Sequence, residues 1–380
     1  MSAGCCPLRR SNYLINDTRE FFQGRKGSTI EPSLCAKLLH EYGPKKSYLK
    51  GEDDAMNLFD RLNNVKEKKQ APKATPKINT PTPIPRGKKI CSPMGECILL
   101  EENYPGKFCF PEKTALIKGN LKLLRGVGVV NEDKLKQQGF HSIDQLITHC
   151  RWGEAAKYIM ELISECKIRE LQSLGARDWE ILSFFRPEDI VFLDIESTGL
   201  WASQPLFLVG VLYLSNSGHL VAEQYFARHY REEKAVLEAV NRVLKKFKVI
   251  VTYNGKRFDL PYITGRAVAH RLFYNYDHFH VDLLYHARKH LKQHLPDCRL
   301  MTLEEYLLGF KREGDIPGYL IPETYHRFVK TSDTALVEPI LEHNRLDLVA
   351  MARLFHLVDP CCAAPVKLAK EQAALTKSSK

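Results

Sequence analysis

The sequence predicts an α/β fold for residues 188–360, and three observations support this prediction. Three strand-like runs follow one another at 190–195, 206–214 and 220–227. Turn residues separate these runs, and helix-like and strand-like patterns alternate after them. The first run also carries two carboxylates one residue apart. We therefore expect a mixed five-stranded sheet with flanking helices.

The segments after the third run complete this pattern. Residues 234–247 repeat apolar side chains with a period of 3.6, which predicts a helix, and 249–253 form a buried-looking strand. A further strand is expected at 279–284. Thr302 and Glu305 have the spacing of a capping box at a helix start, and 335–357 predict a long final helix.

The paired acids of the first strand are the leading functional candidates. Residues i and i+2 of a strand point to one face, so Asp194 and Glu196 should stand side by side within an apolar run. Two neighbouring carboxylates repel each other and resist burial. A bound Mg²⁺ or Mn²⁺ would relieve this repulsion. The alternative is an edge strand whose acids face water.

Three more acids and a histidine are candidates with simpler explanations of their own. Asp259 precedes Pro261 by two residues, which fits a helix N-cap. Asp282 is expected to cap the helix after its strand. His343 and Asp347 are four residues apart and share a helix face, a spacing that is common for surface hydrogen bonds.

Their order along the chain is more specific than any single motif. Asp-x-Glu on the first strand, Asp259 in Asn-Gly-Lys-x-Phe-Asp-x-Pro and Asp347 in the last helix resemble the DEDD superfamily of 3′-to-5′ exonucleases, most closely its YprB-type ribonuclease H-like branch. The resemblance covers about 188–358. It implies a ribonuclease H-like fold in which Asp194, Glu196, Asp259 and Asp347 hold two Mg²⁺ or Mn²⁺ ions for phosphodiester hydrolysis.

The same resemblance implies that His343 orients or deprotonates the attacking water. Three residues separate His343 from Asp347, as in the tyrosine subclass of the superfamily, whereas the histidine subclass has four. YprB-type relatives tend to carry Tyr-Asn where this chain has His343 and Asn344. The identity of the water-activating residue therefore stays open.

The resemblance also assigns residues to substrate binding. Thr198, Gly199 and Leu200 match a turn that contacts the terminal nucleotide in the superfamily. Asn254 and Phe258 match positions near the substrate strand, although Phe258 could equally belong to the core.

Residues 113–187 predict a separate helical module. Gly126 and Gly128 stand in a turn between two helix-like segments, and the sequence resembles a helix-hairpin-helix motif. That resemblance implies that the hairpin amides hold a nucleic-acid phosphate. Glu132 and Asp133 follow where basic residues would help. The alternative is a module that only spaces or binds proteins.

The remaining segments carry charge rather than catalytic motifs. Residues 1–89 hold 18 Lys and Arg against 9 Asp and Glu, so +9 of the net +11 lies there. This region suits a nucleic-acid-binding arm or a solvated one. Short helices are expected at 32–42 and 55–65, a disordered linker at 66–89, a β-rich segment at 90–112 and a tail at 361–380.

The cysteine content and the distribution of apolar residues indicate the cellular compartment of the protein. The 11 cysteines contain no C-x-x-C pair, and Cys91, Cys97 and Cys109 form only a loose cluster, so free thiols are expected. Nothing resembles a signal peptide or a membrane span, which favours a cytoplasmic protein.

The sequence thus predicts a metal-dependent 3′-5′ exonuclease acting on DNA or RNA that has a single-stranded 3′ end. Two alternatives remain: a ribonuclease H-like endonuclease that selects nucleic-acid structures, and a nucleic-acid-binding protein without catalysis.

Overall fold

The computed structural model describes residues 84, 86–104, 115–355 and 357–358. The helices expected at 32–42 and 55–65, most of the linker and the tail lie outside the described residues, as does Cys109. Within the described part, no helix is both long and apolar enough to cross a bilayer.

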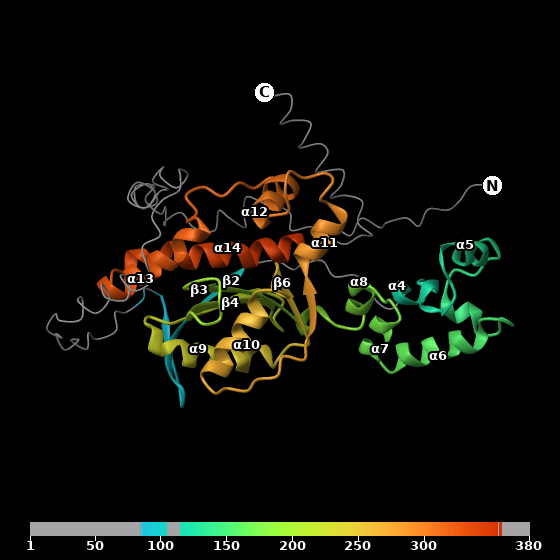
Figure 1. The fold of residues 1–380 in the computed structure, drawn as a ribbon, viewed down its shortest axis with the longest axis horizontal. Helices are drawn as coiled ribbons and strands as arrows, with labels where there is room; N and C mark the ends of the chain where they lie inside the picture. Colours follow the sequence, from blue (N-terminus) through green and yellow to red (C-terminus); the bar gives the residue numbers. More distant parts are fainter. Residues whose placement is uncertain (1–83, 85, 105–114, 356, 359–380) are drawn as a thin grey trace, which may run out of the picture.

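A mixed seven-stranded sheet forms the centre of the molecule, in the order β1-β2-β5-β4-β3-β6-β7 (Figure 1). Its strands are β1 (Lys88–Ser92), β2 (Gly95–Tyr104), β3 (Ile190–Ser197), β4 (Leu206–Leu214), β5 (Leu220–Phe226), β6 (Val249–Thr252) and β7 (Phe279–Asp282). The neighbours of β4 are antiparallel to it, whereas β6 and β7 run parallel to β3. The predicted α/β class is confirmed.

The strand count differs from the expected five, because β1 and β2 form a hairpin that extends the sheet. Residues Ile98 to Tyr104 pair antiparallel with Phe226 to Leu220 of β5. Lys88 and Lys89 were expected in a linker but begin β1. The hairpin covers the otherwise open edge of β5, and Cys97, Ile98 and Leu100 are buried there.

Helices cover both faces of the sheet, and a helical module lies at its side (Figure 1). The described α-helices are α4 (Ala115–Lys118), α5 (Val129–Gln137), α6 (Gly153–Ser164), α7 (Ile168–Ser173), α8 (Asp178–Leu182), α9 (Glu233–Leu244), α10 (Asp259–Ala269), α11 (Leu283–His290), α12 (Leu300–Leu303), α13 (Ile321–Thr331) and α14 (Glu338–Leu354). In Figure 1, α13 and α14 lie on one side of the sheet and α9 and α10 on the other.

One helical prediction is wrong, and one helix was not predicted. Thr302 lies inside a helix that begins at Leu300, and its hydroxyl donates to Asp297 Oδ1 at 2.6 Å, so no capping box starts there. The helix continues as a π-helical turn over Glu304–Leu308. α13 was not predicted, although Ile321, Tyr325 and Phe328 have the spacing of an amphipathic helix and are buried on one face.

Side-chain alternation in β3 decides where its acids point. Val191, Leu193 and Ile195 pack into the core with α9 and α10, whereas Ile190 and Phe192 pack into the core that includes the end of α14. Asp194 and Glu196 continue the second row, so both face the α14 side of the sheet.

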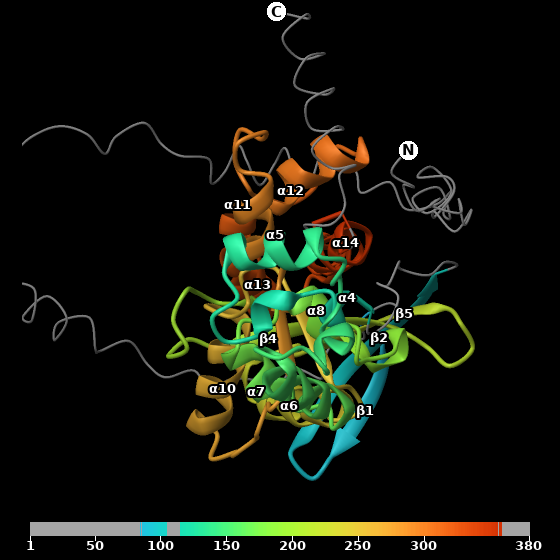
Figure 2. The same ribbon diagram turned by 90° about the vertical axis from the view of Figure 1, so that its right-hand side faces the viewer.

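The helical module is packed against the sheet domain rather than tethered to it. Trp179 of α8 packs on Phe355 with ring centroids 5.1 Å apart, and Phe185 stacks on Phe279 at 5.9 Å. His286 Nε2 lies 3.0 Å from Asp178 Oδ2. Figure 2 shows α5 to α8 stacked in front of the sheet. One continuous core therefore joins the two parts.

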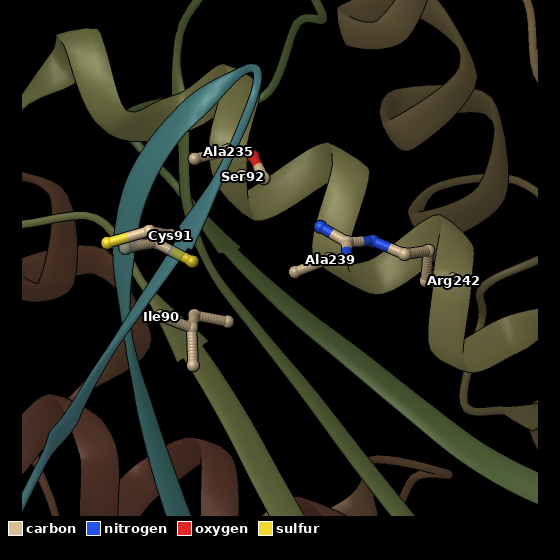
Figure 3. A pocket seen from close by; sticks show the side chains of 7 residues that line it. Ile90, Cys91, Ser92, Ala235, Ala239 and Arg242 are labelled. Atoms are coloured by element: carbon tan, nitrogen blue, oxygen red, sulfur yellow. The ribbon is translucent and has the colours of Figure 1, made fainter.

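The β1–β2 hairpin and α9 enclose a small cavity (Figure 3). It is lined by Ile90, Cys91, Ser92, Cys97, Ala235, Ala239 and Arg242. Its volume of about 10 Å³ holds at most one water molecule. Both cysteines are free thiols, and burial raises the pKa of Cys97 to about 12. The Cys97 thiol is therefore a poor metal ligand.

A buried carboxylate holds α10 against the sheet. Glu233 Oε1 accepts from Leu206 N at 2.7 Å and from Arg266 Nε at 2.6 Å, while its Oε2 lies 2.7 Å from His270 Nε2. Arg266 also donates to Ala202 O at 3.1 Å. One acid thus fixes α10 relative to β4 and to the loop after β3.

We expect Glu233→Ala to lower the free energy of unfolding by about 3–5 kcal/mol, because it leaves the buried Arg266 without its counter-charge. Chemical denaturation followed by circular dichroism measures the change. Glu154→Ala, which removes an exposed pair with Lys157, is the control and should change stability by less than about 0.5 kcal/mol. Equal effects of the two substitutions would contradict this role for Glu233.

Candidate functional site

The site is built on the acids of β3, which are half-buried beside other negative charges. Asp194 Oδ2 accepts from Asn344 Nδ2 at 2.7 Å. Within the described part of the chain, the side chain of Glu196 has no hydrogen bond or ion pair. Burial raises the pKa of Asp194 well above its ordinary range, and the charges of Asp347, Glu196 and Asp259 raise it further. Burial, with the charges of Asp347 and Asp259, does the same for the pKa of Glu196.

The loop from β6 to α10 positions Asp259 at the start of α10. Asn254 has a φ of +72°, and the carboxylate of Asp282 accepts from Asn254 N at 2.9 Å and from Lys256 N at 3.1 Å. Asp282 also accepts from Leu284 N, so its predicted role as a helix cap is confirmed. Asp282 thus shapes the loop that precedes α10.

Asp259 is not the N-cap that its spacing suggested. Phe258 takes the N-cap position and Asp259 is the first residue of α10. Its side chain is buried. Burial raises the pKa of Asp259 to about 7, and the charges of Asp282 and Asp347 add to the rise, whereas a hydrogen bond from the amide of Ile195 opposes it. The carboxylate therefore lies against β3, beside Asp194 and Glu196.

α14 brings Asn344 under β3 and β4. Asn344 is fully buried, and its Oδ1 accepts from Gln224 Nε2 at 2.9 Å while its Nδ2 donates to Asp194. Gly210, the β4 residue paired with Asp194, leaves the room that this amide occupies. A Cβ at Gly210 would lie 2.1 Å from Asn344 Oδ1. The amide is thereby fixed with its donor toward Asp194.

The buried side chain of Arg312 forms an ion pair with Asp347, the acid of α14. The side chain of Arg312 is 1% exposed, and its Nη2 lies 2.6 Å from Asp347 Oδ1 in an ion pair with poor hydrogen-bond alignment. Its Nε donates to Glu304 Oε2 at 2.8 Å and its Nη1 to Asp315 Oδ2 at 3.0 Å. One guanidinium therefore joins three carboxylates from separate segments.

His343 lies in the same cluster. Its Nδ1 is 2.8 Å from Asp315 Oδ1, and its Nε2 is 3.9 Å from Asp347 Oδ2. Burial lowers the pKa of His343, but the hydrogen bond to Asp315 and the charges of Asp347 and Asp315 outweigh it, so the pKa lies above its ordinary value. The ring therefore bridges the loop before α13 and the last acid.

The structure brings the predicted acids of three elements, Asp194, Glu196, Asp259 and Asp347, within electrostatic reach of one another and of His343. In the described residues, no three His, Cys, Asp or Glu side chains already converge as a metal cage. Asn344 and Arg312 hold two of the acids instead. Carboxylate oxygens with excess negative charge nevertheless form a donor set that suits Mg²⁺ or Mn²⁺.

The turn after β3 presents apolar side chains to solvent. Thr198 is buried, and both its N and its Oγ1 donate to Pro205 O. Gly199 O accepts from Ser197 Oγ and Tyr262 OH, and a Cβ at Gly199 would collide with the side chain of Gln204. Leu200 and Trp201 are 77% and 75% exposed. Thr198 and Gly199 thus shape the turn, and Leu200 and Trp201 form its outer surface.

The contacts of Phe258, Gly126 and Gly128 describe their local structure and do not assign a role in binding. Phe258 is partly buried against Tyr262, with ring centroids 5.3 Å apart. Gly126 has a φ of +85°, and Gly128 is the N-cap of α5. Glu132 forms ion pairs with Lys122 and Lys136, both at 2.9 Å. The acid that departs from the expected motif is therefore a structural partner of two lysines.

Comparison with known proteins identifies the superfamily of this part of the chain. The sequence pattern of the ribonuclease H superfamily matches residues 191–358. These residues form a ribonuclease H-like domain. The domain is related to YprB of Bacillus subtilis (strain 168), an uncharacterized protein that is 30% identical over 175 residues. That match covers 45% of this chain and 42% of YprB.

A solved structure gives a weaker match. The family B DNA polymerase of the hyperthermophilic archaeon Pyrobaculum calidifontis shares 20% identity, with a TM-score of 0.38. The match covers 49% of this chain and 27% of the polymerase.

Sequence reasoning assigned no role to five residues of the ribonuclease H-like domain that lie at the acids or at the turn after β3. They are Gln224, Asn344, Arg312, Asp315 and Trp201. Arg312 and Asp315 lie in a segment without secondary-structure periodicity, and only their polarity among apolar neighbours could have drawn attention to them. Trp201 directly follows the turn that the sequence singled out, so its position was the available signal.

We expect Asp259→Asn to stabilise the metal-free protein at neutral pH. The folded-state pKa of about 7 lies above the unfolded value, so Asp259 costs stability as the pH rises from about 4 to 7. The substitution should raise the melting temperature by about 2–8 °C in EDTA at pH 7.5 and reduce the loss of stability between pH 5 and 8. Differential scanning fluorimetry measures both effects. The exposed substitution Asp133→Asn should change neither, and an unstabilised Asp259→Asn protein would refute the assignment.

Proposed function

We propose that the ribonuclease H-like domain hydrolyses phosphodiester bonds from the 3′ end of a nucleic acid, using two divalent cations. One observation carries this proposal: Asp194, Glu196, Asp259 and Asp347 are gathered from β3, α10 and α14 on one face of the sheet, where neighbouring negative charges raise the pKa values of Asp194, Glu196 and Asp259. Proteins of this superfamily that act on nucleic acids typically use divalent metals.

The residues of the chain have distinct tasks in this proposal. Bound Mg²⁺ or Mn²⁺ would supply an acidified water and stabilise charge on the phosphate and leaving group. Among the described residues, Glu196 and Asp259 are the acids that no other side chain contacts by a hydrogen bond or an ion pair, so they are the first available ligands. Asn344 orients Asp194, and Arg312 orients Asp347. His343, with its Nε2 toward Asp347, accepts the proton of the attacking water.

The turn after β3 supports an unpaired strand end as the substrate. Leu200 and Trp201 lie immediately beyond the strand that carries Asp194 and Glu196. The turn is held by Tyr262 OH, which donates to Gly199 O and to Gln204 O, and by Arg266, which donates to Ala202 O. A rigid turn with an exposed indole offers a surface on which a nucleobase can stack without sequence preference.

The helical module would add contacts to the phosphate backbone. The first-turn amides of α5, after Gly128, have no helical acceptor by the geometry of any helix start. Arg125 and Lys134 are exposed nearby, and in the described part of the chain neither forms an ion pair. These groups can hold a phosphate without reading a base.

The proposal is tested with oligonucleotides of DNA and RNA, single-stranded and duplex, labelled at the 5′ end so that products form a ladder. We expect Mg²⁺- or Mn²⁺-dependent shortening from the 3′ end, and a loss of at least about 10³-fold in rate for Asp194→Ala and Asp347→Asn. Asp144→Ala, an exposed acid of the helical module, is the control and should be as active as the wild type.

A 3′-blocked substrate separates the two modes of cutting. An exonuclease stalls on it, whereas internal cleavage proceeds. If Asp194→Ala degrades the substrates as fast as the wild type, the proposed function is wrong. Metal-independent, salt-sensitive binding without turnover would instead identify a binding protein.

We expect Trp201→Ala to raise the KM for single-stranded substrates by about 5–50-fold, because base–aromatic stacking contributes about 1–3 kcal/mol. The kcat should change by less than about threefold, since the acids are untouched. Steady-state kinetics give both values. Phe273→Ala is the matched control, because Phe273 is 83% exposed but lies beyond the opposite end of α10. An unchanged KM for Trp201→Ala would remove the turn from the substrate path.

A further inference from the structure

We propose that Asp315 is the positioning residue for His343: it holds the ring so that Nε2 carries the lone pair and points toward Asp347, and Arg312 anchors it there. This inference rests on the proposed function, since it assigns the group that directs the proton acceptor. Asp315 acts on the reaction through His343 and Arg312.

The geometry uses both oxygens of Asp315. Oδ1 lies 2.8 Å from His343 Nδ1, and Oδ2 accepts from Arg312 Nη1 at 3.0 Å. The side chain of Asp315 is 6% exposed, so water does not compete strongly for either contact. A carboxylate held at two points has little freedom to rotate, and it fixes the plane of the imidazole that it contacts.

The contact also selects a tautomer. Asp315 is ionised, because its contacts with His343 and Arg312 hold its pKa below the ordinary range despite burial. An ionised carboxylate can only accept, so Nδ1 must donate its proton to Oδ1. In the neutral ring the lone pair then lies on Nε2, the nitrogen that faces Asp347 Oδ2 at 3.9 Å. A carboxylate on Nδ1 also makes Nε2 a stronger base.

Arg312 links Asp315 to the last acid, Asp347. The same guanidinium that holds Asp315 forms an ion pair with Asp347 Oδ1 and bonds Glu304. Oδ1 of Asp347 is therefore engaged, and Oδ2 is the oxygen that shares its surroundings with His343 Nε2. Asp315 and Arg312 thus direct one nitrogen and one oxygen toward a common point, where an attacking water could be held.

A purely structural role for Asp315 is the competing explanation, and it predicts different results. A buried carboxylate that only neutralises Arg312 would affect stability when replaced. It would not set the proton position on His343, and it would lower kcat only in proportion to the folded fraction.

The test compares Asp315→Ala and Asp315→Asn with wild-type protein. The amide of Asp315→Asn has the same shape and can still accept from Nδ1, although it lacks the charge. Asp333→Asn, a replacement at the N-cap of the short turn before α14, is the matched control, because among the described residues the Asp333 carboxylate accepts only from the backbone of Ala335. Thermal melts of all variants report the folded fraction.

The decisive measurement is ¹⁵N NMR of the His343 ring without metal, at alkaline pH where the ring is neutral. We expect the proton on Nδ1 in the wild type and in Asp315→Asn, and a shift of the population toward the Nε2–H tautomer in Asp315→Ala. A wild-type ring protonated on Nε2, or a tautomer unchanged by Asp315→Ala, would overturn the proposal.

Kinetics provide the second measurement. We expect Asp315→Ala to lower kcat by about 10–100-fold with KM within about twofold of wild type, and Asp315→Asn to lie between them. Equal kcat for folded Asp315→Ala and wild type would refute the role. A wild-type protein without nuclease activity would refute the proposed function instead, while the NMR result would still decide whether Asp315 sets the tautomer.

Discussion

Mutual repulsion among closely placed carboxylates is the constraint on which the rest of the ribonuclease H-like domain depends. Asp194 and Glu196 are forced onto one face of β3 by the pleat of the strand, and Asp259 is carried to the same place by α10. A sheet that buries these charges together loses stability unless neighbouring groups compensate. The surrounding network can be understood as that compensation, arranged so that some of the charge stays available to a cation.

Neighbouring side chains compensate the negative charge of some of these acids and not of others. The amide of Asn344 supports Asp194, and the guanidinium of Arg312 neutralises part of the charge on Asp347. Glu196 and Asp259 receive no comparable side-chain partner within the described residues. The domain therefore holds two of its acids rigidly and leaves the other two with the highest demand for a positive charge. Under the proposed function, such a division suits a site that is ordered before a metal arrives.

The sequence was sufficient to predict the elements that follow a simple periodicity and the acids that those elements carry. Strand alternation placed Asp194 and Glu196 on one face, and chain order related them to Asp259 and Asp347. The β1–β2 hairpin escaped prediction as part of the sheet, because local pattern does not reveal which edge a hairpin joins. Arg312 and Asp315 escaped it for a similar reason, since only the three-dimensional fold brings their irregular segment against α14.

Gly210 extends the site to a strand that carries none of its acids. Its missing side chain is the space into which the amide of Asn344 fits, since Oδ1 of that amide lies only 2.1 Å from the position that a Cβ would take. An alanine there would leave every carboxylate and the histidine unchanged in sequence, yet it would displace the group that orients Asp194. Under the proposed function, a chain that keeps all the signature acids but carries a larger residue at this position would lack an oriented Asp194, and the motifs alone would not reveal that difference.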